Sequence, residues 1–178
     1  ARVERLTLDP PAAGRPARLA LLVAITVFAH TAFNGSRVSV SLYALSLQSS
    51  PLTVGLLISL YSVLPMLLSV SAGRMIDRVG TFRPIVASSV VLAAGVGLPA
   101  LVPGLPALYA ACTVIGVAFM VFHIAIQNAV ASISAPEQRS VNYSWLALGF
   151  SISGFLGPTT AGLGIDGAGH RAAFALLA

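Results

Sequence analysis

The chain has 178 residues, of which 57% are apolar and 8% are charged, and its formal net charge is +5. A water-soluble domain has about 25% charged residues, so this composition excludes a chain wetted on all sides and indicates a protein of the lipid bilayer. All ten basic residues are arginines, and most stand in polar breaks between apolar runs rather than along one solvated face. That placement argues against nucleic acid as a partner.

Residues 1–18 are polar and hold three prolines and four arginines, which is typical of a tail outside the membrane. Residues 19–47 form the first predicted span. At 1.5 Å per residue this span is ~43 Å long against a ~30 Å hydrocarbon core, so it tilts or projects. A cleavable signal peptide is excluded as an alternative because its apolar core has only ~7–15 residues.

Four further apolar runs and the beginning of another follow. They predict spans at 52–72, 83–101, 106–133 and 141–164, and a sixth run begins at 172–178. The sixth run is too short to cross a bilayer, so we expect the chain to be cut inside a helix. The predicted fold is an all-α membrane bundle of five transmembrane helices plus the start of a sixth, with a kink at Pro65.

The arginines also predict an orientation. Eight of them fall in the tail and in the breaks at 73–84 and 136–139, whereas Arg171 alone falls in a break of the opposite set. Because arginines are retained on the cytoplasmic side, the N-terminus and both of these breaks are predicted to be cytoplasmic. We expect an integral protein of the bacterial inner (plasma) membrane.

The break at 73–84 carries the most specific motif. It lies between two runs without charge, so we expect a short turn at the water interface. The pattern Gly73-x-x-x-Asp77-Arg78-x-Gly80-x-x-Arg83 resembles the loop between the second and third helices of the major facilitator superfamily. The resemblance covers nearly all of the chain. It implies that residues 19–178 are most of the N-terminal half of a twelve-helix transporter, and that a missing C-terminal six-helix half supplies the opposite wall of a central cavity.

The same resemblance implies a conformational latch on the cytoplasmic side. Asp77 would pack against the N-terminal end of a helix in the other half, where the helix dipole favours a carboxylate. Arg78 or Arg83 would pair with a nearby acid, for which Glu137 is the candidate in this chain. The alternative is that the arginines only fix the topology. The full set of predicted latch residues is Gly73, Asp77, Arg78, Gly80, Arg83 and Glu137.

A polar stripe runs along the first span. Its members recur at steps of three or four residues and share an arc of roughly 80° at 100° per residue. They are Thr26, His30, Asn34, Arg37 and Ser41, with Gln48 on the same line. Such a stripe faces protein or water rather than lipid. Arg37 is interpreted as a cavity residue, with snorkelling to headgroups or an ion pair to the other half as alternatives.

The fourth span repeats part of this spacing. His123 and Gln127 are one turn apart, as are His30 and Asn34. In the family that the chain resembles, the first and fourth helices correspond in internal repeats, although chance similarity explains the pattern equally well. We interpret His123 and Gln127 as substrate or gate residues, and a hydrogen bond in the core is the alternative.

The fifth span holds small residues at close intervals. Gly154, Gly157, Pro158 and Gly162 resemble, in part, a glycine-proline motif of proton-coupled drug exporters in the same superfamily, and helix packing is the alternative reading. Those exporters carry an arginine four residues before a glycine in the fourth helix. Here Cys112 stands at that spacing before Gly116, which argues against the drug-exporter reading.

The resemblance and the polar stripe together predict secondary active transport of a small solute by alternating access. His30 and Arg37 favour an organic anion or carboxylate-bearing metabolite. The alternatives are proton-coupled efflux of drugs or metabolites, with a proton as candidate coupling ion, and a non-transporting membrane receptor or scaffold. An enzyme is disfavoured because no nucleophile, base and orienting group fall close together. Three histidines and one cysteine, widely spaced, predict neither a metal site nor a cofactor.

Overall fold

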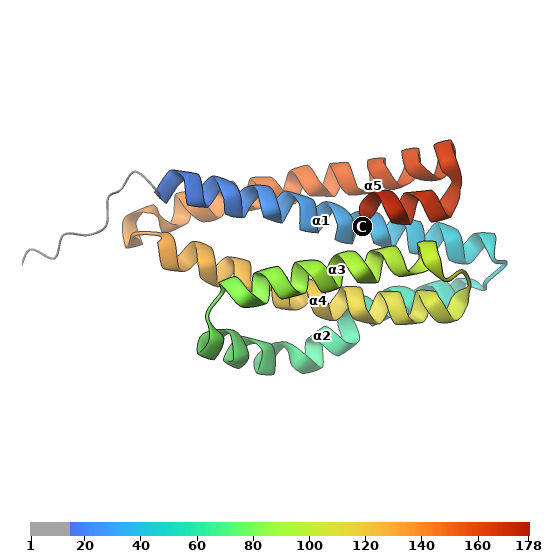
Figure 1. Ribbon diagram of the computed structural model, residues 1–178, viewed down its shortest axis with the longest axis horizontal. Helices are drawn as coiled ribbons and strands as arrows, with labels where there is room; N and C mark the ends of the chain where they lie inside the picture. Colours follow the sequence, from blue (N-terminus) through green and yellow to red (C-terminus); the bar gives the residue numbers. More distant parts are fainter. Residues whose placement is uncertain (1–14) are drawn as a thin grey trace, which may run out of the picture.

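The computed structural model describes residues 15–178, which form a bundle of long helices (Figure 1). In chain order the elements are α1 (Arg15–Ser46), α2 (Pro51–Val79), α3 (Phe82–Leu101), α4 (Leu105–Ile133), the short 3₁₀ helix η2 (Pro136–Gln138) and α5 (Arg139–Leu177). Five of them are long and apolar enough to cross a membrane. The predicted all-α membrane bundle is therefore confirmed.

Most of the predicted N-terminal tail, residues 1–14, lies outside the described residues. Helix α1 begins at Arg15, four residues before the predicted start of the first span at 19. Pro16 is tolerated in the first turn of a helix, where the backbone N–H groups have no partner inside the helix. The helix can therefore extend beyond the apolar run.

Successive helices run in opposite directions, so the breaks alternate between the two ends of the bundle (Figure 1). The start of α1, the break between α2 and α3, and η2 lie at the same end. The arginine-rich breaks therefore share one end of the molecule, as the sequence predicts.

The break at 73–84 is almost entirely helical, so the prediction of a turn over this stretch is wrong in its extent. Helix α2 continues to Val79, and only Gly80 and Thr81 separate it from α3. Gly80 has φ 79°, a conformation open to glycine, and its N–H donates to the Ile76 carbonyl at 2.9 Å. Arginine is a good helix former, and the positive charge of Arg78 in the last turn is favoured by the helix dipole. The helix therefore continues beyond the end of the apolar run.

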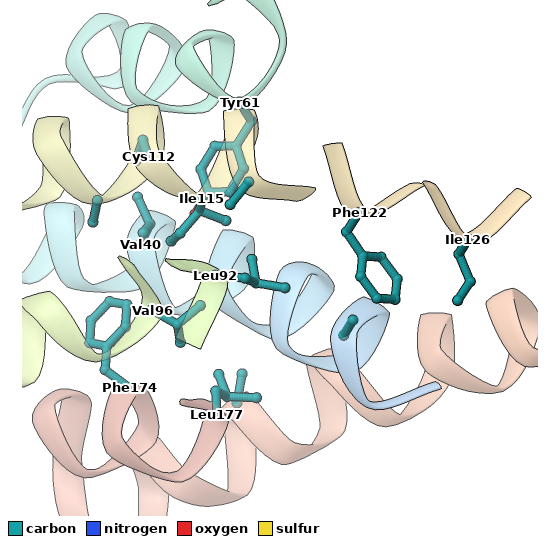
Figure 2. Packing of buried hydrophobic residues seen from close by; sticks show 14 of the residues in the cluster. Val40, Tyr61, Leu92, Val96, Cys112, Ile115, Phe122, Ile126, Phe174 and Leu177 are labelled. Carbon is teal, nitrogen blue, oxygen red and sulfur yellow. The ribbon is translucent and has the colours of Figure 1, made fainter. Parts of the chain in front are cut away.

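The predicted break that holds Arg171 is similarly short. The helical path of α5 is interrupted at Gly169, with φ 82° and ψ 174°, and the last residues double back along the bundle (Figure 1). The Arg171 Nε donates to the Ala100 carbonyl at 2.8 Å, and Phe174 and Leu177 are buried. In Figure 2 both of these apolar side chains lie in the core with Val40 of α1 and Val96 of α3.

Two glycines allow helices to cross closely. A Cβ built at Gly157 would lie 2.8 Å from the backbone nitrogen of Gly35, so α5 and α1 touch backbone to backbone. A Cβ at Gly116 would lie 2.8 Å from the carbonyl oxygen of Tyr61, which brings α4 equally close to α2. A Cβ built at Gly154 or at Gly162 would have no neighbouring atom within 4 Å. Among the motif glycines of α5, close contact therefore exists at Gly157, as small residues permit between membrane helices.

We predict that Gly157→Ala lowers the stability of the protein by about 1–3 kcal/mol, because the added methyl overpacks the crossing with α1. Gly154→Ala is the matched control. It should leave stability unchanged or raise it by about 0.5–1 kcal/mol, since alanine is the better helix former. Thermal unfolding in detergent measures both. Equal stability of the two variants would contradict the close crossing.

Candidate functional site

His30 lies inside the bundle between α1, α4 and α5. Only 7% of its surface is exposed, and Nδ1 lies 3.1 Å from the Thr26 carbonyl oxygen, to which it donates. The Phe150 ring stacks on the imidazole at a centroid distance of 4.4 Å, and the Phe119 ring meets it edge-on at 4.6 Å. The imidazole is therefore held in a fixed orientation by one hydrogen bond and two aromatic rings.

His123 of α4 meets His30 in this interior. The two imidazole centroids are 5.5 Å apart, and the His123 ring also lies 5.4 Å from Phe150 and 5.9 Å from Phe119. The Nδ1 atom of His123 is buried and has no hydrogen-bond partner in the described part of the chain. We call these four side chains, His30, Phe119, His123 and Phe150, the aromatic cluster. Two histidines singled out from the sequence on separate helices are thus brought together.

Phe33 connects the aromatic cluster to Arg37. Its ring stacks on Phe119 at 3.7 Å with an interplanar angle of 12°, and it contacts the Tyr61 ring edge-on at 5.5 Å. On the other side, the guanidinium carbon of Arg37 lies 6.0 Å from the Phe33 centroid. This is the outer limit of a cation–π contact. A continuous path of side-chain contacts therefore runs from Arg37 to both imidazoles.

Arg37 is exposed and lies in a groove of about 440 Å³. Helix α1 contributes Asn34, Arg37, Val38, Ser41 and Leu42, α2 contributes Ile58, and α5 contributes Gly154 and Pro158. We call it the α1 groove. The open space at Gly154 helps to form it, since a side chain there would stand in the groove. Among residues 15–178 no acid lines the groove, so none of them neutralises the positive charge of Arg37 within it.

The polar stripe therefore divides into two parts. Thr26 is fully buried and donates its hydroxyl to the Leu22 carbonyl at 2.7 Å, and His30 is likewise enclosed. Asn34, Arg37 and Ser41 line the open groove, and the Ser41 hydroxyl donates to the Arg37 carbonyl at 2.9 Å. Gln48, predicted to continue the stripe, lies beyond the end of α1 and is exposed with φ 58°.

Gln127 stands apart from both the α1 groove and the aromatic cluster. It is half-buried in α4, and its backbone carbonyl accepts the Tyr143 hydroxyl at 3.1 Å. This bond joins the last third of α4 to the start of α5, at the end of the bundle that carries η2. The structure thus places His123 beside His30, while Gln127, one turn further on, lies closer to the arginine-rich end.

The sequence analysis missed the aromatic residues Phe33, Phe119 and Phe150. Phe119 precedes His123 by one helical turn, so the two share a face of α4, and this spacing was a readable signal. Phe33 precedes Asn34 in the stripe. Phe150 had no local signal, because its place against His30 depends on how α5 crosses α1.

The predicted latch residues lie at the arginine-rich end. Asp77, Arg78, Gly80 and Arg83 are exposed around the α2–α3 break, and Glu137 is exposed in η2. Gly73 is inside α2, with open space beside it. No ion pair joins Glu137 to Arg78 or Arg83 in the described part of the chain. These charged side chains are therefore available to a further partner at this end.

The family model described as Major Facilitator Superfamily matches residues 21–178, which includes all of α2 to α5 and nearly all of α1. No curated protein matches the chain.

We predict that His123→Phe raises stability by about 1 kcal/mol, because phenylalanine keeps the ring packing and removes a buried nitrogen without a partner. His30→Phe is the matched comparison. It loses the hydrogen bond to Thr26 and should lower stability by about 0.5–1.5 kcal/mol. Thermal unfolding of both variants in detergent gives the answer. A destabilised His123→Phe protein would show that Nδ1 is bonded after all.

Proposed function

Since the chain belongs to the major facilitator superfamily, we propose that it moves a small organic anion across the membrane, with the anion bound at Arg37 in the α1 groove. Membership makes it an integral membrane protein and, in general terms, a secondary transporter of small solutes. The substrate class is the new part of the proposal, and the exposed, unneutralised guanidinium of Arg37 is the observation that supports it.

The depth of Arg37 argues for binding rather than for an anchor at the surface. Arg37 precedes Ser46, the last residue of α1, by nine positions, which is about 14 Å along the helix at 1.5 Å per residue. The headgroup layer on each side of the core is only roughly 5–8 Å thick. With Ser46 at the membrane surface, an arginine at this depth requires water, an acid or an anion, and no acid of the described residues lines the groove.

The other lining residues suit an anion with an apolar body. Asn34 offers both a donor and an acceptor beside Arg37, whereas Val38, Leu42 and Ile58 present hydrocarbon. A volume of about 440 Å³ falls in the range of small-molecule sites, roughly 300–1,000 Å³. A carboxylate bound by the guanidinium, with its carbon skeleton against the apolar walls, fits this arrangement.

In this proposal the two histidines act behind the groove. Phe33 and Phe119 separate His30 and His123 from Arg37, so the imidazoles reach a substrate only when these rings move. A change at Arg37 would be transmitted through the stacked rings to the histidine pair. The pair is our candidate carrier for a coupling proton, and Gln127 with Tyr143 is our candidate for a gate near the arginine-rich end.

The arginine-rich end is proposed to be cytoplasmic and to carry the latch. The exposed carboxylate of Asp77 would pack against a helix N-terminus of a second six-helix half, and the α1 groove would face that half. Arg78, Arg83 and Glu137 would add charge contacts that form when the cavity opens outward. Such contacts have to break in each cycle, so they are few and nearly balanced.

Proton-coupled efflux is the second candidate. It is favoured by Gly157 and Pro158, because the close crossing of Gly157 with Gly35 gives this glycine-proline step a structural role. It is opposed by Cys112, which is fully buried in α4 where exporters of that class carry an arginine. A panel of organic anions and neutral drugs separates the two candidates by which compounds are transported.

We predict that Arg37→Ala raises the KM for an organic anion about 10- to 100-fold, because a hydrogen bond to a charged group contributes roughly 1.5–3 kcal/mol. Arg37→Lys should recover part of the loss, since lysine keeps the charge but not the bidentate geometry. Arg139→Gln, an exposed arginine at the start of α5, is the control. Uptake into proteoliposomes measures all three. Normal transport by Arg37→Ala would exclude the proposed substrate role.

We predict that Asp77→Asn shifts the protein toward the inward-open state and slows transport, because the amide loses the charge that favours a helix N-terminus by about 0.3–1 kcal/mol. Asp166→Asn, at the opposite end of the bundle, is the matched control. Labelling of single cysteines on the two sides of the membrane reports the conformational balance. An unchanged labelling pattern and rate in Asp77→Asn would reject the latch.

A further inference from the structure

We propose that an anionic phospholipid binds on the outside of the bundle at the α2–α3 end. Its phosphate would contact Arg74 and Arg78, and one acyl chain would lie in a groove between α2, α3 and α4. This site shares no lining residue with the α1 groove and stands independently of the transported substrate.

The proposed acyl-chain groove has a volume of about 450 Å³. Its walls are mostly aliphatic and include Met75 of α2, Ala87 and Val91 of α3, and Val114, Val117 and Val121 of α4. It also contains two hydroxyl groups, and both are satisfied within their own helices. Ser88 donates to the Pro84 carbonyl at 2.5 Å, and Thr113 donates to the Tyr109 carbonyl at 2.9 Å. No hydroxyl group of the groove therefore needs a hydrogen bond from a ligand, so a hydrocarbon chain can occupy the groove without leaving a polar group unpaired.

A basic depression adjoins this groove. It has a volume of about 350 Å³ and is lined by Arg74, Arg78, Ser71, Met75 and Val79. Arg74 and Arg78 are four residues apart, so they lie on one face of α2, and in the part of the chain that the structure describes no acidic residue lines either depression. Met75 lines both, so the two depressions adjoin at this side chain. Two unneutralised guanidinium groups at the mouth of an apolar groove match a phosphate joined to an acyl chain.

The position along the helices also fits a lipid. Arg78 is in the last turn of α2, where a helix that crosses the bilayer would leave it. From Pro84 to Val91 the groove follows α3 for about 10 Å toward the middle of the bilayer, at 1.5 Å per residue. Headgroup and chain would therefore lie at the depths that they occupy in a leaflet. A soluble anion would not use the apolar groove, and a zwitterionic lipid would place an ammonium group beside the two arginines.

The test is native mass spectrometry of the intact protein in detergent with added dioleoyl phosphatidylglycerol. Dioleoyl phosphatidylcholine serves as the neutral lipid, and glycerol 3-phosphate serves as a headgroup without chains. Three variants are compared with the parent protein. The double variant Arg74→Gln/Arg78→Gln removes the charges, Ala87→Phe fills the groove from an exposed position, and Arg139→Gln removes an exposed arginine elsewhere at the same end.

We expect the parent and Arg139→Gln to bind phosphatidylglycerol equally, and in preference to phosphatidylcholine. The double variant should bind it about 30-fold more weakly, since each arginine near an anionic lipid contributes roughly a fivefold factor. Ala87→Phe should also weaken binding, and glycerol 3-phosphate should not compete. Full binding by the double variant or by Ala87→Phe would overturn the proposal, as would an equal loss in Arg139→Gln.

Discussion

The contact between α1 and α5 at Gly35 and Gly157 determines what the candidate site looks like. Because neither residue has a side chain, the two backbones meet directly, and a Cβ at Gly157 would lie 2.8 Å from the Gly35 nitrogen. Two helical turns before this contact α5 carries Phe150 against His30. Next to the contact it carries Gly154 and Pro158, which line the α1 groove. A wider crossing would move Phe150 away from His30, and it would move the α5 wall away from the rest of the α1 groove. One backbone contact therefore positions both the buried and the open part of the site.

The division of the polar stripe follows from what each side chain needs. Thr26 and His30 can satisfy their donors with carbonyl oxygens of their own helix, so burial costs them little. A guanidinium has five donors and a permanent charge, and one helix cannot satisfy it. Arg37 accordingly stands in the groove and contacts Phe33 at long range. The Nδ1 of His123 is one of five buried side-chain atoms without a hydrogen-bond partner in the described part of the chain, and the one that lies in the aromatic cluster. A buried polar atom left without a partner lowers stability, so it calls for an explanation other than packing.

Hydropathy and spacing were enough to predict the helical bundle and the shared end of the charged breaks. These are local properties, since a long apolar run has to form a helix in lipid. The sequence was less informative about helix ends. Residues 73–79 appeared to be a turn because they are charged, yet arginine is a good helix former, and Arg74 and Arg78 continue the helix beyond the apolar run. The stacking of Phe33 on Phe119 and the approach of His30 to His123 depend on how distant helices cross, which periodicity within one helix does not encode.

Anion binding at Arg37 requires this end of α1 to face water within the membrane. Cys112 is the chain's single cysteine and is buried, so a spin label can be placed at Ser41→Cys in the groove, and at Val90→Cys on the exposed face of α3. In bilayer vesicles we expect the label at position 41 to collide mainly with a water-soluble nickel chelate, and the label at position 90 to collide mainly with oxygen dissolved in lipid. A label at position 41 that behaves like the one at position 90 would contradict the account.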